Sequence, residues 1–147
     1  MTDSVNGPWL PALLEHALRR LRPTLLTLSE DRFPGLRARH YRLLVMLPTG
    51  GERLSRLAEV AGLTKQALAQ TLDPLLAAGF VEVGPDPADG RARLVRRTSA
   101  GTEVVRAVRT AMEQVEADWA AEVGAERWAV VREVLTELSR AKPATSG

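Results

Sequence analysis

The side chains best suited to chemistry in this sequence are glutamines, a lysine and arginines, and they gather in two neighbouring segments. Residues 64–70 read Thr-Lys-Gln-Ala-Leu-Ala-Gln, and residues 91–97 contain Arg91, Arg93, Arg96 and Arg97. A glutamine amide can form two hydrogen bonds with an adenine edge, and alanine can contact a thymine methyl group. An arginine can enter a minor groove or hold a phosphate. These residue types favour recognition of duplex DNA.

An enzymatic site is not expected. The chain has two histidines, no cysteine and no glycine-rich phosphate loop, so no known spacing for a nucleophilic triad, a metal site or a nucleotide site is present. Asp86 and Asp89 are close in sequence, but they lie in a run of turn-forming residues that accounts for both. Neither a metal nor a cofactor is predicted.

Overall composition says little about partners. The 147 residues are 45% apolar and 26% charged, with a net charge of +2, which is ordinary for a globular protein that buries a core without disulfides. No apolar run approaches the roughly 20 residues that cross a bilayer, and the N-terminus lacks the pattern of a signal peptide. Together with the absence of cysteine, these features predict a cytoplasmic protein without membrane contact.

Two short helices with a tight turn between them are predicted to position the glutamine-bearing segment. A helix anchored by Leu54 and Leu57 is expected to end at Gly62, and Thr64 is a good N-cap for a second helix that runs to about Ala78. This is helix-turn-helix form, although a plain helical hairpin with a solvated polar face is the alternative. The outer face of the second helix is expected to present Lys65, Gln66, Ala67, Ala69 and Gln70.

The spacing of apolar residues changes after this helix. Residues 81–83 and 93–97 suggest strands, and the turn-forming residues 86–90 lie between them, which predicts a two-stranded hairpin. Its protruding tip would present Arg91, and Asp89 would orient that arginine by a charge-assisted hydrogen bond. A solvated edge strand protected by its charge is the alternative.

Longer helices flank this middle region. Leucines at 10, 14, 18, 21, 25 and 28 form one apolar stripe, which Pro23 is expected to kink or break. A helix over about 36–47 follows. After the hairpin, a helix capped by Thr98 or Ser99 is expected to end at Gly124, and a last helix carries apolar residues from Trp128 to Leu138.

The flanking stripes are expected to need apolar partners. A chain of this size offers too little core to cover the stripes at 10–28, 104–119 and 128–138, so we expect them to pair with a second copy. Trp119 and Trp128 are candidates for that interface, and packing within one subunit is the alternative.

The order of elements and the hairpin residues resemble the MarR family of bacterial winged-helix regulators. The wing in that family commonly reads Asp-x-x-Asp-x-Arg, which matches Asp86, Asp89 and Arg91, and the next helix begins Leu-Thr-x-x-Gly, where this chain has Thr98 and Gly101. The resemblance covers nearly the whole chain. It implies a mainly α fold with a small β-hairpin wing, divided into an N-terminal dimerisation helix (1–35), a winged helix-turn-helix (36–100) and C-terminal dimerisation helices (101–147).

The resemblance also implies a function. We expect a homodimeric, sequence-specific DNA-binding regulator, most simply a repressor, with the recognition helix at about 64–78 in the major groove and the wing at about 84–93 at the minor groove. The operator would be pseudo-palindromic, with half-sites about 10 base pairs apart. A winged helix that binds protein instead of DNA is the alternative. The predicted DNA contacts are Ser55, Thr64, Lys65, Gln66, Ala67, Ala69, Gln70, Asp89, Arg91 and Arg93.

Two positions depart from the family pattern. Pro74 falls inside the expected recognition helix, where a proline costs on the order of 3 kcal/mol unless the helix bends, so the length and tilt of that helix are open. Gln70 stands where the family often has arginine, which would remove a phosphate or guanine contact.

Many members of this family bind small aromatic acids or phenols between the dimer helices and the DNA-binding lobe. The resemblance therefore implies a small aromatic or phenolic effector for this chain. The residues expected near such a cleft are Trp9, His16, His40 and Tyr41. Structural packing of the two histidines is the alternative.

Overall fold

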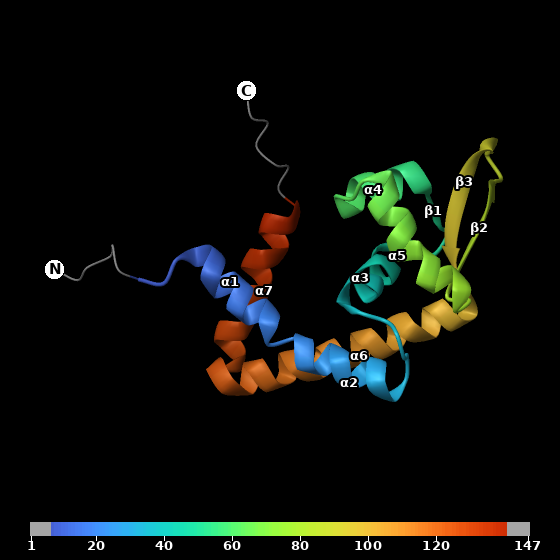
Figure 1. The fold of residues 1–147 in the computed structure, drawn as a ribbon. Helices are drawn as coiled ribbons and strands as arrows, with labels where there is room; N and C mark the ends of the chain where they lie inside the picture. Colours follow the sequence, from blue (N-terminus) through green and yellow to red (C-terminus); the bar gives the residue numbers. More distant parts are fainter. Residues whose placement is uncertain (1–6, 141–147) are drawn as a thin grey trace, which may run out of the picture. The chain divides into compact units, whose positions relative to one another are not determined.

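The structure is a computed structural model that describes residues 7–140 (Figure 1). The predicted end segments also include residues 1–6 and 141–147, which lie outside the described residues. The chain divides into two compact units between Ala111 and Met112.

The predicted mainly α fold with a small β wing is confirmed. The elements are α1 (Leu10–Arg19), α2 (Arg22–Asp31), α3 (Ala38–Met46), β1 (Glu52–Arg53), α4 (Leu54–Ala61), α5 (Lys65–Ala77), β2 (Val81–Asp86), β3 (Asp89–Arg97), α6 (Ser99–Val123) and α7 (Ala125–Arg140).

The first leucine stripe lies on two helices. Pro23 occupies the first turn of α2, where its missing N–H would have no helical partner, so the predicted break comes just before it. A buried hydrogen bond of 2.6 Å between the Ser29 and Tyr41 hydroxyl groups joins α2 to α3. The leucines of α1 remain exposed, and that helix buries no residue.

The helix-turn-helix forms as its sequence predicts. Gly62 ends α4 in the left-handed conformation, with φ of 67°, which a residue without Cβ adopts at little cost. The hydroxyl of Thr64 accepts a 3.1 Å hydrogen bond from the Ala67 backbone and caps α5. Leu57 and Leu75 are almost fully buried where α3, α4 and α5 pack beside the sheet (Figure 1).

Pro74 does not end the recognition helix, because α5 continues to Ala77. The proline lacks the N–H that would bond the carbonyl of Gln70, four residues earlier. Both Gln70 and Pro74 are exposed, so water can satisfy that carbonyl.

The wing is a three-stranded antiparallel sheet in the order β1-β3-β2. The two long strands pair with Val83 opposite Val95, and their ladder extends to Asp86 and Asp89. The turn is therefore shorter than predicted. The predicted hairpin forms from β2 and β3, and the prediction missed only a third strand, β1, which pairs with the other edge of β3.

Gly51 allows β1 to approach β3 closely. A Cβ there would lie 2.6 Å from the backbone oxygen of Val95, and the residue has φ of 88°. Only glycine meets both conditions without strain. The segment before α4 is thereby attached to the wing.

The start of α6 explains the Thr-x-x-Gly pattern in physical terms. The Thr98 hydroxyl accepts a 3.2 Å hydrogen bond from the Gly101 backbone and caps the helix. A Cβ on Gly101 would lie 2.0 Å from the backbone oxygen of Phe80, so any larger residue would push α6 away from the start of the wing. Val104 and Val108 of this first part of α6 are buried.

The second unit contains the end of α6 and α7. Gly124, with φ of 96°, separates them. The rings of Trp119 and Trp128 pack edge to face, with centroids 5.3 Å apart, so the two tryptophans contact each other within one subunit. Glu116 accepts a hydrogen bond from the Trp128 indole and pairs with Arg132, and the bond from Arg132 holds the pKa of Glu116 below its usual value.

Candidate nucleic-acid interface

The first turns of α5 present an exposed polar surface. Lys65, Gln66, Ala69 and Gln70 are exposed, whereas Ala67 is half-buried. The difference follows from the helical repeat, since Leu68 and Thr71 on the opposite side are buried in the core. Four of the five residues predicted for the outer face are therefore fully available to a partner.

A groove with a volume of about 460 Å³ lies between α5 and the wing. It brings together predicted contact residues from three elements: Ser55 of α4, Lys65 and Ala69 of α5, and Arg93 of β3. The predicted recognition helix α5 and the wing strand β3 thus line the same groove. The groove is lined by Arg53, Leu54, Ser55, Lys65, Leu68, Ala69, Leu72, Asp73, Leu76, Val83, Ala92 and Arg93.

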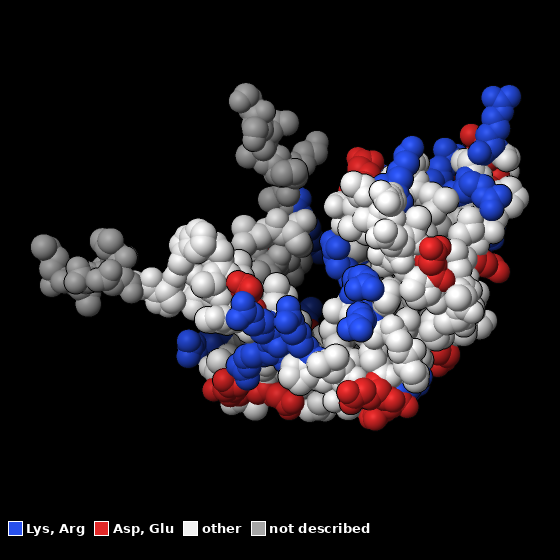
Figure 2. Space-filling view, in the orientation of Figure 1, with Lys and Arg blue, Asp and Glu red and all other residues white. Residues whose placement is uncertain are grey.

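The wing tip is exposed and presents charged side chains, two of them arginines. Asp89, Arg91 and Arg93 are all exposed. Figure 2 shows Lys and Arg side chains projecting from one edge of the winged segment (residues 36–100), the edge that carries α4 and the tip of the hairpin. Such an edge can approach a polyanion.

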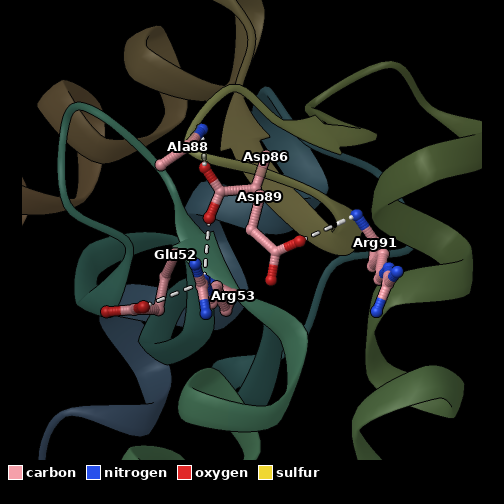
Figure 3. Close-up of polar contacts among 6 residues, drawn as sticks. All are labelled: Glu52, Arg53, Asp86, Ala88, Asp89 and Arg91. Carbon is pink, nitrogen blue, oxygen red and sulfur yellow. Dashed lines mark hydrogen bonds and ion pairs between the residues drawn. The ribbon is translucent and has the colours of Figure 1, made fainter.

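Asp89 does not orient the Arg91 guanidinium, and this part of the prediction needs correction. Its carboxylate accepts a 3.1 Å hydrogen bond from the backbone N–H of Arg91 (Figure 3). Among residues 7–140, no hydrogen bond or ion pair joins that carboxylate to the guanidinium. Asp89 therefore shapes the turn, and the Arg91 side chain stays available at the tip.

The charge-assisted pair at the wing is instead Arg53 with Asp86, which sequence reasoning missed. The Arg53 Nε donates to Asp86 Oδ2 over 2.7 Å, and the Ala88 backbone N–H donates to Asp86 Oδ1 over 2.9 Å (Figure 3). The hydrogen bond from Ala88, followed by that from Arg53, lowers the pKa of Asp86. One signal in the sequence was the residue type: an arginine stands at the N-cap position of α4, where Ser, Thr, Asp or Asn is preferred.

The four residues predicted near an effector do not share a surface. Trp9 is 76% exposed, and His16 is exposed on α1, whereas His40 and Tyr41 are buried in α3. The Nδ1 of His40 accepts a 2.9 Å hydrogen bond from the Arg37 backbone at the start of that helix. Burial, and then Arg39 and Arg37, lower the pKa of His40. None of the four lines the groove beside α5.

Residues 7–140 contain neither a metal site nor a membrane-spanning helix. No group of three or more His, Cys, Asp or Glu side chains is placed to hold a metal ion there. Over the same described residues, no helix has the length and apolar character needed to cross a membrane.

Residues 35–92 match the sequence model of the MarR family. No curated protein sequence matches the chain. Among solved structures, the reduced form of MarR from E. coli is 21% identical, with a TM-score of 0.75 over 90% of this chain and 98% of that one.

Two further similar structures were solved with DNA. FabT of Streptococcus pneumoniae in complex with DNA is 17% identical, with a TM-score of 0.73 over 88% of this chain and 92% of that one. The transcriptional repressor CouR bound to a 23-mer DNA duplex is also 17% identical, with a TM-score of 0.73 over 95% of this chain and 99% of that one. At these identities the similarity establishes the fold.

Proposed function

We propose that this chain, which residues 35–92 identify as a winged-helix member of the MarR family, binds duplex DNA as a homodimer and regulates transcription. Members of the family are transcription regulators and not enzymes, in agreement with the sequence-based expectation. The observation that carries the proposal is that Lys65 and Ala69 of α5 and Arg93 of the wing line one exposed groove.

The chemistry of α5 suits the edge of a base pair. Gln66 and Gln70 are exposed on the first two turns and can each bond an adenine in the major groove, while the Ala69 methyl group can contact a thymine. The free N–H groups at the start of the helix favour a phosphate. Arg91, beyond the end of the groove, would lie at the adjacent minor groove.

Homodimerisation is proposed from the terminal helices. Neither α1 nor α7 buries a residue, and each exposes large apolar side chains, among them Leu10, Leu18 and Leu138. A second copy of the chain would cover these faces and would set two wings on two half-sites of one duplex.

Repression relieved by a small ligand is the regulatory mode that we propose. The similar protein CouR is named a transcriptional repressor. The groove of about 460 Å³ has the size of a small-molecule site, and three of its lining residues, Arg53, Lys65 and Arg93, suit an aromatic acid. Benzoate added to the protein–DNA complex should release the DNA, whereas the uncharged benzyl alcohol should not. Equal release by both would contradict an anion-selective site.

The alternative function is protein binding through the winged helix. A mobility-shift assay on DNA that flanks the gene, repeated across a salt series, separates the two. We expect binding that survives excess mixed-sequence competitor and weakens by orders of magnitude between about 50 and 200 mM salt. Failure to bind duplex DNA at low salt would contradict the proposal and favour a protein partner.

A further inference from the structure

We propose that Arg53 contacts the DNA backbone and that Asp86 holds its guanidinium in position for this contact. The inference rests on the proposed function, because it assigns a phosphate contact to the same interface. It adds a residue that neither the helix-turn-helix pattern nor the wing motif includes.

Arg53 lies between the two parts of the interface. It precedes α4 directly, pairs with Leu94 in the short ladder between β1 and β3, and lines the groove together with Ser55, Lys65 and Arg93. Its side chain is 45% exposed. The residue therefore faces the groove from an element that is attached to the wing.

The guanidinium of Arg53 is only partly engaged. Its Nε donates to Asp86 Oδ2, and within residues 7–140 its two terminal Nη groups make no hydrogen bond. These Nη groups form the fork that matches two oxygens of a phosphate. The exposed side chain can therefore bind a phosphate without releasing Asp86.

The carboxylate of Asp86 is itself held in place and can therefore orient the arginine. Its side chain is 12% exposed, and its other carboxylate oxygen is fixed by the Ala88 backbone N–H. Both hydrogen bonds lower the pKa of Asp86. Its carboxyl group therefore stays ionised at pH values below those at which an ordinary aspartate is protonated. An arginine oriented in advance loses less side-chain entropy when it binds.

Cations predominate among the charged side chains that line the groove. Three cationic side chains, Arg53, Lys65 and Arg93, line it against one carboxylate, that of Asp73. The hydrogen bond and the charge of Asp86 raise the pKa of Arg53, and the charges of Asp89 and Glu52 raise it further. The arginine thus keeps its charge while a phosphate approaches.

The experiment measures affinity for a labelled mixed-sequence DNA duplex by fluorescence anisotropy, between about 50 and 200 mM salt. Arg53→Gln should weaken binding roughly eightfold near 0.1 M salt and should reduce the slope of log K against log salt by about 0.9, as expected for one lost phosphate contact. Arg106→Gln is the matched control, because Arg106 is an exposed arginine paired with Glu103 on α6. It should leave the slope unchanged.

Asp86→Asn separates positioning from charge. The asparagine oxygen can still accept the hydrogen bond from the Ala88 N–H. The NH2 group then takes the place of Asp86 Oδ2, and it cannot accept a hydrogen bond from Arg53. Removal of a negative charge near DNA would by itself tighten binding. We expect weaker binding instead, and we expect no weakening when the same change is made in the Arg53→Gln background.

The outcomes distinguish this inference from the proposed function. Wild-type binding that does not depend on salt would overturn both. Salt-dependent wild-type binding with an unchanged slope in Arg53→Gln would overturn the assignment of Arg53 alone. Equal weakening by Asp86→Asn in both backgrounds would show that Asp86 acts through the wing turn, and would overturn its positioning role. Circular dichroism of each variant identifies any loss of fold. Arg53→Lys keeps the positive charge, so its slope of log K against log salt should lie between those of Arg53→Gln and the wild type.

Discussion

The winged segment and the terminal helices bury their apolar residues in opposite ways. Leu44, Leu75 and Val95 of the winged segment are completely buried. In contrast, α1 and α7 bury no residue, and Leu10 and Leu138 are 64% and 66% exposed. The winged segment thus contains a buried apolar core, whereas the terminal helices leave apolar faces that another surface can cover.

Under the proposed function, this difference places DNA reading and subunit pairing in separate parts of the chain. A rigid core can hold α5 and the wing at a fixed spacing without help from the terminal helices. Substitutions should therefore damage stability, assembly or DNA binding one at a time, according to where they fall.

The largest expected effect is on the stability of the winged segment. Leu75→Ala should lower the free energy of unfolding by about 2–5 kcal/mol, because it opens a cavity at a completely buried position. Val60→Ala on α4, at a side chain that is 48% exposed, should change it by less than about 0.5 kcal/mol. Urea denaturation measures both. Similar losses for the two variants would contradict the described core.

The next largest effect concerns assembly. Leu135→Glu places a charge on the exposed apolar face of α7, where Leu135 is 48% exposed. It should weaken the dimer about tenfold or more, as measured by sedimentation equilibrium, and Glu137→Gln on the same helix should not. A variant that remains as dimeric as the wild type would exclude this face from the interface.

A smaller effect is expected at the wing tip. Arg91→Ala should weaken DNA binding roughly tenfold, because it removes a groove contact, while the unfolding curve and the dimer stay unchanged. Arg109→Ala, at an exposed arginine of α6, serves as the control in the same anisotropy assay. The wing assignment fails if the two variants bind DNA equally well.

The local parts of the fold were predictable because local chemistry determines them. Gly62, the Thr64 cap and Gly124 each act within a few residues of the chain, and each ends or begins a helix where the sequence indicates. The exposed face of α5 follows in the same way from the positions of its leucines.

The missed features depend on contacts between distant residues. The strand β1 has two residues and no strand-like pattern of its own, and it exists because Gly51 permits close approach to Val95. The ion pair of Arg53 with Asp86 spans 33 residues. The orienting role predicted for Asp89 was wrong, because its carboxylate accepts the backbone N–H of Arg91 within the turn and makes no hydrogen bond to the guanidinium among the described residues.

The smallest expected effect is a pH dependence at the join of α2 and α3. Burial lowers the pKa of His40 from 6.5, so the unfolded chain binds the proton more readily than the folded chain. Stability should therefore be full above about pH 6.5 and should decline as the pH falls toward the lower pKa of the folded state.

His40→Asn tests this dependence, because the asparagine oxygen can accept the Arg37 backbone N–H in place of Nδ1. Thermal unfolding at a series of pH values should show a shallower decline below about pH 6.5 in this variant than in the wild type. Identical profiles would show that His40 does not contribute.

Methylation protection tests most directly whether α5 and the wing engage adjacent grooves of one duplex. Guanine N7 lies in the major groove and adenine N3 in the minor groove, so one reagent reports on both. The account predicts protection of guanine N7 in two segments about one helical turn apart, with neighbouring adenine N3 protection that Arg91→Ala alone abolishes. Protection confined to one groove, or adenine N3 protection that survives in Arg91→Ala, would contradict it.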